Sequence, residues 1–128
     1  MARKKSPNLT EAELRLMNVI WDKQRATVSD VVDALPDEPG SAYNTVLTTM
    51  RILEDKGYIT HDKPAEARAF VYHPLIGRDE AGRSAVRYLI NRFFGDSPAS
   101  LVQNLLDDKE LSAKELRRIR KMLAEDAR

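Results

Sequence analysis

The chain contains no cysteine among its 128 residues. It therefore has no disulfide bond, no thiolate metal ligand and no thiol nucleophile. Histidine is almost as scarce, since His61 and His73 are the only two and neither has a histidine partner at metal-ligand spacing. There are only five glycines, and they form neither a glycine-rich phosphate loop nor a nucleophile elbow. These absences predict a protein that is not an enzyme and that holds no metal and no other cofactor.

Long apolar runs are also missing. No segment approaches the roughly 18–20 apolar residues that a membrane span requires. The basic start MARKKSPN leads into an amphipathic pattern, and no apolar signal core follows it. We therefore expect a cytoplasmic protein without membrane insertion. Its length fits one domain, or one small domain with an appendage.

The chain lacks an excess of charge of either sign, with 21 Lys and Arg against 20 Asp and Glu. Through residue 74 there are ten basic and eleven acidic residues, so this part carries 10 − 11 = −1. Attraction to phosphate normally dominates affinity for DNA, so a DNA-binding protein of this composition must gather its cations on one face. The candidate cations are Arg3, Lys4, Lys5, Arg51, Lys63 and Arg68.

Two capping boxes mark the first two helices. Thr10 with Glu13 starts a helix that runs to about residue 21, and Thr27 with Asp30 starts a short one that Pro36 ends. The stripes expected to face the core are Leu14, Met17, Ile20 and Trp21 in the first helix, and Val31, Val32 and Leu35 in the second.

A third helix is predicted over residues 41–56, and its two faces differ sharply. At about 100° per residue its apolar side carries Ala42, Val46, Met50 and Leu53. The opposite side carries Ser41, Asn44, Thr45, Thr48 and Arg51, where an ordinary surface helix would carry Glu and Lys pairs. Short polar side chains allow a partner to come close, and arginine can grip phosphate or guanine. This face is typical of a DNA-reading helix, and the alternative is a polar face that is merely solvated.

A β-hairpin is predicted directly after the third helix. Gly57 suits the left-handed position that ends a helix, and strands over residues 58–62 and 68–73 flank a turn at 63–67. In the second strand Phe70 and Tyr72 point to one face. Helix, short helix, turn, helix and hairpin is the order of a winged helix-turn-helix. We assign residues 1–76 to this DNA-binding domain, within a mainly α fold that has a small β-hairpin wing (α+β).

Residues 74–77 are interpreted as a hinge, after which a helical domain is predicted over residues 77–128. Its helices are expected at residues 78–94, 98–106 and 113–124, with Ser97 and Ser112 as N-caps. So short a segment cannot bury so many apolar side chains by itself, which favours pairing with a second copy. The alternative is that these helices pack back onto the winged domain. The candidate dimerisation residues are Leu89, Phe93, Leu101, Val102, Leu105, Leu116, Ile119, Met122 and Leu123.

The runs YNTVLTTMRILEDKG and ARAFVYHPL, in this order and spacing, resemble the penicillinase-repressor (BlaI/MecI/CopY) family. The resemblance extends from about residue 9 to residue 122. It implies a homodimeric transcriptional repressor whose winged helices bind a palindromic double-stranded DNA operator. The positions that match the DNA-contacting helix and wing are Ser41, Tyr43, Asn44, Thr45, Thr48, Arg51, Lys63 and Arg68.

The resemblance also implies a means of control. In the antibiotic-resistance branch a membrane-bound sensor metalloprotease system relieves repression by cleavage in the C-terminal domain. The matching bond here lies between Asn104 and Leu105, although cleaved relatives usually carry Phe at the second position. The copper-responsive branch uses a cysteine-rich hook, which this chain lacks.

Two other interpretations stay open on the sequence. The winged helix could be a protein-interaction module that never meets DNA, as the near-neutral first part of the chain allows. Alternatively, the apolar C-terminal helices could hold a small molecule in a regulator that senses a ligand.

Overall fold

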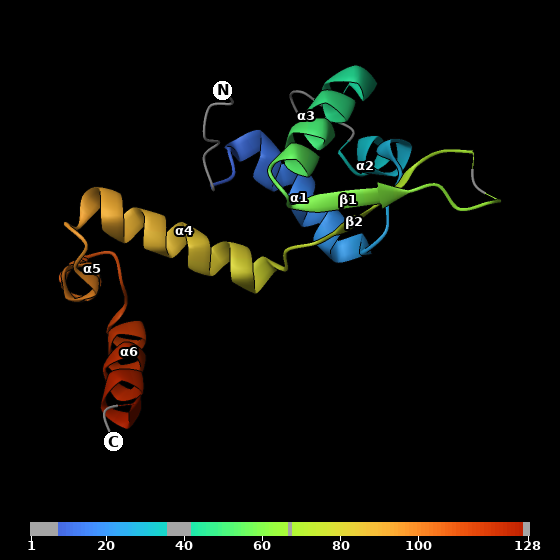
Figure 1. Ribbon diagram of the computed structural model, residues 1–128. Helices are drawn as coiled ribbons and strands as arrows, with labels where there is room; N and C mark the ends of the chain where they lie inside the picture. Colours follow the sequence, from blue (N-terminus) through green and yellow to red (C-terminus); the bar gives the residue numbers. More distant parts are fainter. Residues whose placement is uncertain (1–7, 36–41, 67, 127–128) are drawn as a thin grey trace. The chain divides into compact units, whose positions relative to one another are not determined.

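Residues 8–35, 42–66 and 68–126, the part of the chain described in this computed structural model, form six helices and one antiparallel hairpin (Figure 1). This confirms the mainly α fold with a small β-hairpin. The elements are α1 (Glu11–Lys23), α2 (Val28–Ala34), α3 (Tyr43–Asp55), β1 (Ile59–Asp62), β2 (Val71–Pro74), α4 (Arg78–Phe93), α5 (Pro98–Leu106) and α6 (Ala113–Asp126).

The chain divides into two compact units, Met1–Ala85 and Val86–Arg128. The division falls inside α4, so the first two turns of that helix belong with the winged helix. The segment at residues 74–77, interpreted as a hinge, is hydrogen-bonded to the first unit. Leu75 N donates to Tyr58 O at 2.8 Å, and Trp21 Nε1 donates to Ile76 O at 2.9 Å.

Both predicted capping boxes are confirmed. Thr10 Oγ1 accepts from Glu13 N at 3.1 Å, and Glu13 Oε1 accepts from Thr10 N at 2.8 Å. Thr27 and Asp30 make the same pair of bonds, at 3.1 and 2.9 Å. These bonds satisfy amide groups that the first turn of a helix leaves without an intrahelical partner.

The core of the first unit lies between α1, α2, α3 and the hairpin. Its fully buried side chains are Met17, Ile20, Val31, Val46, Met50, Leu53 and Ile59. Two expected core residues are not in it. Leu14 is 40% exposed because it lies about a quarter turn from the centre of the buried stripe of α1, on a wheel of about 100° per residue. Ala42 is exposed because it is the N-cap of α3 and precedes its first turn.

The hairpin is shorter than the sequence predicts. Its register runs from Ile59 opposite Pro74 to Asp62 opposite Val71, so residues 68–70 belong to the connecting loop and not to the strand. The sequence also does not predict that a third segment of the chain pairs with the hairpin. Ala26 pairs with Tyr72 through bonds of 3.0 and 2.8 Å, which fasten the base of the wing to the segment between α1 and α2.

Candidate nucleic-acid interface

The outward side of α3 is open, as the sequence predicts. Asn44, Thr45, Thr48 and Arg51 are all exposed, while Val46, Met50 and Leu53 on the opposite side have no exposed area. Ser41 lies outside the described residues. Tyr43 occupies the first turn and is half exposed. No described residue of the first unit therefore covers the side of α3 that the sequence assigns to DNA.

The threonine hydroxyls of α3 are oriented by the helix itself. Thr48 Oγ1 donates to Asn44 O at 2.9 Å, and Thr49 Oγ1 donates to Thr45 O at 3.0 Å. Each hydroxyl proton is thus directed at a backbone carbonyl. What Thr48 offers to a partner in this rotamer is its oxygen lone pairs and its methyl group. Both are suited to the edge of a base, through an amino donor or a thymine methyl.

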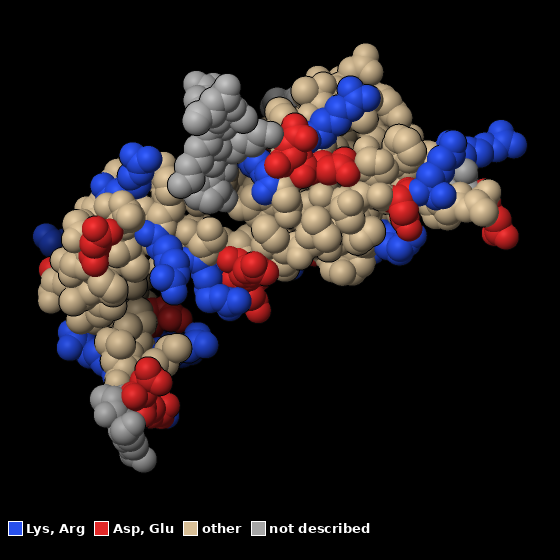
Figure 2. Space-filling view, in the orientation of Figure 1, with Lys and Arg blue, Asp and Glu red and all other residues tan. Residues whose placement is uncertain are grey.

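A groove of about 430 Å³ runs between α3, the start of α2 and the wing. Tyr43 and Arg51 line it from α3, and Lys63 and Arg68 line it from the hairpin loop. Three of the predicted cations are therefore brought to one concave surface. Figure 2 shows Lys and Arg atoms gathered at the end of the hairpin, with Asp and Glu atoms among them. A chain with almost no net charge can bind DNA only if its cations are gathered on one face, and these three cations meet part of that requirement.

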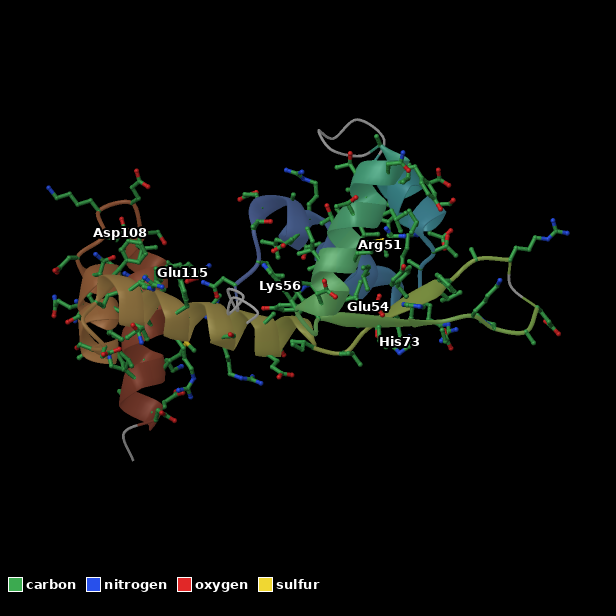
Figure 3. All side chains as sticks on the ribbon, turned by 45° about the horizontal axis from the view of Figure 1, so that its top comes forward. Arg51, Glu54, Lys56, His73, Asp108 and Glu115 are labelled. Atoms are coloured by element: carbon green, nitrogen blue, oxygen red, sulfur yellow. The ribbon has the colours of Figure 1, made fainter. Side chains whose placement is uncertain are left out.

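His61 and Glu54 also line this groove, and sequence reasoning missed them as a pair. His61 Nδ1 lies 2.7 Å from Glu54 Oε2, which joins β1 to the last turns of α3. Its ring lies 4.5 Å from that of Phe70 and 5.2 Å from that of Tyr72. His61 is thus partly buried, whereas a histidine on a wing is more often fully exposed to solvent. Figure 3 shows Glu54 one turn beyond Arg51 along α3.

Burial and the charges around the groove change the pKa of the Tyr72 hydroxyl. Burial raises the pKa of Tyr72 above its ordinary value, and the Glu54 carboxylate raises it further. The Arg51 guanidinium lowers the same pKa, and Tyr43 raises it. Tyr72 is therefore neutral at physiological pH. Its hydroxyl lies within the electrostatic influence of both the Glu54 carboxylate and the Arg51 guanidinium.

The far end of α3 is held by a buried ion pair. Lys56 Nζ lies 2.8 Å from Glu13 Oε1 and donates to Asn8 O at 3.1 Å, and the Lys56 and Glu13 side chains are only 10% and 7% exposed. Glu13 thus both caps α1 and anchors α3. The sequence signals only the cap, because the ion pair joins residues 43 positions apart.

The C-terminal unit presents apolar side chains to solvent. None of the described residues of α4, α5 and α6 is buried. Among the candidate dimerisation residues, Leu89, Phe93, Leu105, Met122 and Leu123 are exposed, with Phe93 at 73%. Leu101, Val102, Leu116 and Ile119 are partly buried. Asn104 is exposed, and the Asn104–Leu105 bond lies within α5.

Two other features are absent from the described part of the chain. No three His, Asp or Glu side chains there are grouped so as to hold a metal ion. Among the described helices, none has the length and apolar character needed to cross a membrane.

Comparison with known proteins places the chain. The model of the penicillinase repressor family matches residues 9–125. The penicillinase repressor of Bacillus licheniformis is 31% identical over 122 residues, which cover 95% of this chain and 94% of that protein. The methicillin resistance regulatory protein MecI of Staphylococcus aureus is 25% identical over 119 residues, covering 93% of this chain and 95% of MecI.

A solved structure agrees with these matches. The solution structure of the DNA-binding domain of the repressor BlaI is 32% identical, with a TM-score of 0.50, and it covers 61% of this chain and 93% of that domain. The likeness supports the winged-helix fold. The chain therefore belongs to the penicillinase repressor family, a family of transcriptional repressors and not of enzymes.

Proposed function

We propose that the protein is a homodimeric transcriptional repressor that binds a palindromic DNA operator through α3 and the wing. One observation carries the proposal: the uncovered, small-residue polar side of α3 adjoins a groove that also receives Arg51, Lys63 and Arg68. A helix of this kind fits the major groove, and a basic hairpin beside it fits the flanking backbone. The likeness to the BlaI DNA-binding domain supports this assignment.

The residues of α3 divide between bases and backbone. Asn44 suits adenine, whose N6 and N7 an amide can bind together, and Thr45 and Thr48 suit a thymine methyl. Ser41 and Tyr43, near the helix start, and Arg51, Lys63 and Arg68, around the groove, would contact phosphates. These phosphate contacts would fix the register of the helix on the duplex, while Asn44, Thr45 and Thr48 would select the base sequence.

A mobility-shift titration with duplex DNA from upstream of the protein's own gene tests the proposal. We expect binding that resists random-sequence competitor and that weakens steeply as salt increases, since phosphate contacts release counterions. A winged helix that binds only proteins would show neither specific binding nor a salt slope. Such a result would remove DNA from the function.

Arg51→Ala and Arg68→Ala should each weaken operator binding by roughly 1–3 kcal/mol if the side chain is fully engaged. Removing a phosphate contact should also reduce the salt slope by about one ion per site. Fluorescence anisotropy over a salt series would measure both effects. Arg118→Ala, which removes an exposed arginine paired with Glu115 in α6, is the matched control. Wild-type affinity in both test variants would exclude these arginines from the interface.

We propose dimerisation because the described residues of the second unit leave their apolar side chains without a buried core. A 43-residue unit in which no described residue is buried gains little stability by itself. A second copy offers the same apolar surface, and a two-fold pair would also present two α3 helices to two half-sites, about one or two helical turns apart. Release of the operator then requires only loss of the dimer.

Proteolysis between Asn104 and Leu105 is one way to release the dimer, and its partner would be a membrane-bound sensor metalloprotease system. Because the bond lies within α5, that helix must unwind locally before an extended segment can enter a protease. Ser100→Pro removes the amide that donates to the N-cap oxygen Ser97 Oγ at 3.1 Å, so it should loosen the first turn of α5 and speed cleavage. Ser100→Ala keeps that amide and should not. Intact-mass measurement after induction of the host's sensor system checks this. An uncut chain under induction would contradict proteolytic relief.

A further inference from the structure

The Glu54–His61 pair occupies an unusual place for a carboxylate. It lies in the groove where α3 and the wing would meet the DNA backbone, so its charge faces the side that phosphates approach. A carboxylate beside phosphate weakens binding unless a cation compensates it. The imidazole at 2.7 Å is the group that can supply this compensation, and it does so only when protonated.

The packing around His61 keeps the pair together. Phe70 and Tyr72 of the hairpin lie against the ring, and Tyr72 is itself fixed by the backbone pairing with Ala26. With about a third of its side chain exposed, His61 is reachable from the groove without being free to turn away. The imidazole is thus held between Glu54 and the approaching backbone.

The electrostatic potential of the groove also depends on the other charged and titratable side chains that line it. The titratable or charged side chains that line it are Tyr43, Arg51 and Glu54 from α3, Lys63 and Arg68 from the loop of the wing, and Tyr72 from β2. The residues that α2 contributes, Thr27, Val28 and Ser29, do not titrate. Histidine is the side chain whose charge changes most readily between about pH 5 and pH 8. Among the described lining residues, His61 is the one histidine.

We propose that the Glu54–His61 pair makes operator binding proton-linked, with His61 taking up a proton as the DNA backbone docks against the groove. This rests on the proposed function. A phosphate near the ring adds a second negative charge to that of Glu54, and both favour the imidazolium over the neutral ring. The bound state then holds more protons than the free state, up to one for each subunit.

The direction of the effect follows from linkage. Because binding takes up protons, the affinity rises as the pH falls through the range in which free and bound protein differ in protonation. The DNA-bound form is thus favoured by mild acidification. Glu54 has a positioning role in this scheme, since it orients the ring and stabilises its charge without contacting the duplex.

The test is the pH dependence of operator affinity for the full-length chain at fixed ionic strength. The probe is the duplex from upstream of its own gene, measured by anisotropy between about pH 8 and about pH 6. We expect wild-type affinity to rise about threefold to tenfold per pH unit as the pH falls. In His61→Gln, which keeps a hydrogen-bonding group but cannot titrate, the slope should be flat.

His73→Gln is the matched control, because His73 is the only other histidine in the chain and does not line the groove. It should keep the wild-type slope. Glu54→Gln should bind more tightly than wild type at pH 8, since it removes a carboxylate from the groove. If His61→Gln folds poorly, the Glu54 variant and calorimetric proton uptake in buffers of different ionisation enthalpy still decide the matter for the wild-type chain.

Specific binding that does not change with pH, or a slope that survives in His61→Gln, would overturn this inference and leave the proposed function standing. Absence of specific duplex binding at every pH would overturn both. The two failures are therefore distinguishable in one titration series.

Discussion

Lys56→Met should destabilise the first unit by about 3–5 kcal/mol, because it leaves the Glu13 carboxylate buried without its cation. The two side chains are 10% and 7% exposed, so water cannot replace the lost partner. Methionine keeps most of the volume, which separates the loss of charge from the loss of packing. Urea unfolding followed by circular dichroism would measure the change, and a fall of this size is a large part of a small domain's stability.

Two further variants sharpen this measurement. Lys63→Met removes an exposed lysine from the wing loop and should change stability by less than about 0.5 kcal/mol. The double variant Glu13→Gln with Lys56→Met should recover much of the loss, because Gln can still accept from Thr10 N without carrying a charge. If the single Lys56 variant were as stable as wild type, the ion pair would not anchor α3.

The anchor also bears on recognition. Lys56 is the C-cap of α3, so the bond to Glu13 fixes the end of that helix opposite to the one that carries Asn44. A helix held only by its apolar stripe can rock about that stripe. In the proposed repressor, the Glu13–Lys56 pair would therefore help to fix the angle at which α3 meets the DNA.

Local features of this fold could be predicted from the sequence because they depend on neighbours. The capping boxes at Thr10 and Thr27 involve residues three apart, and both form. The end of α3 at Gly57 depends on one residue that tolerates positive φ, and its φ is 85°. The exposed polar side of α3 follows from helical periodicity alone.

Contacts between distant residues could not be predicted in this way. Trp21 fills the core, as the sequence predicts, but nothing local indicates that its indole would donate to Ile76 O, 55 positions away. The Glu13–Lys56 and Glu54–His61 pairs are likewise invisible to a pattern of hydrophobic and polar residues. The sequence predicts too long a wing, because strand propensity at residues 68–70 cannot reveal that pairing with β1 stops at Asp62.

If the proposed dimer forms through the second unit, a chain that ends at Ala85 should fold, remain monomeric and bind the operator about 10²–10⁴-fold more weakly than the full-length chain. The end point matters, because a cut at Pro74 would remove the Trp21–Ile76 bond and the Arg78–Asp22 pair, both of which belong to the first unit. In the proposed dimer the second half-site would be bound at a high effective concentration, and the truncated chain loses this advantage.

A point substitution tests the same idea in the complete chain. Phe93 is 73% exposed in α4, so Phe93→Glu costs the isolated subunit little but places a charge in the proposed dimer surface. Asn91→Glu, on the opposite side of the same helix, is the matched control and should leave the dimer intact. Sedimentation velocity would report the oligomeric state, and anisotropy would report the affinity. A full-length Phe93→Glu chain that still dimerises and binds as wild type would show that the operator-binding form is assembled through a different surface.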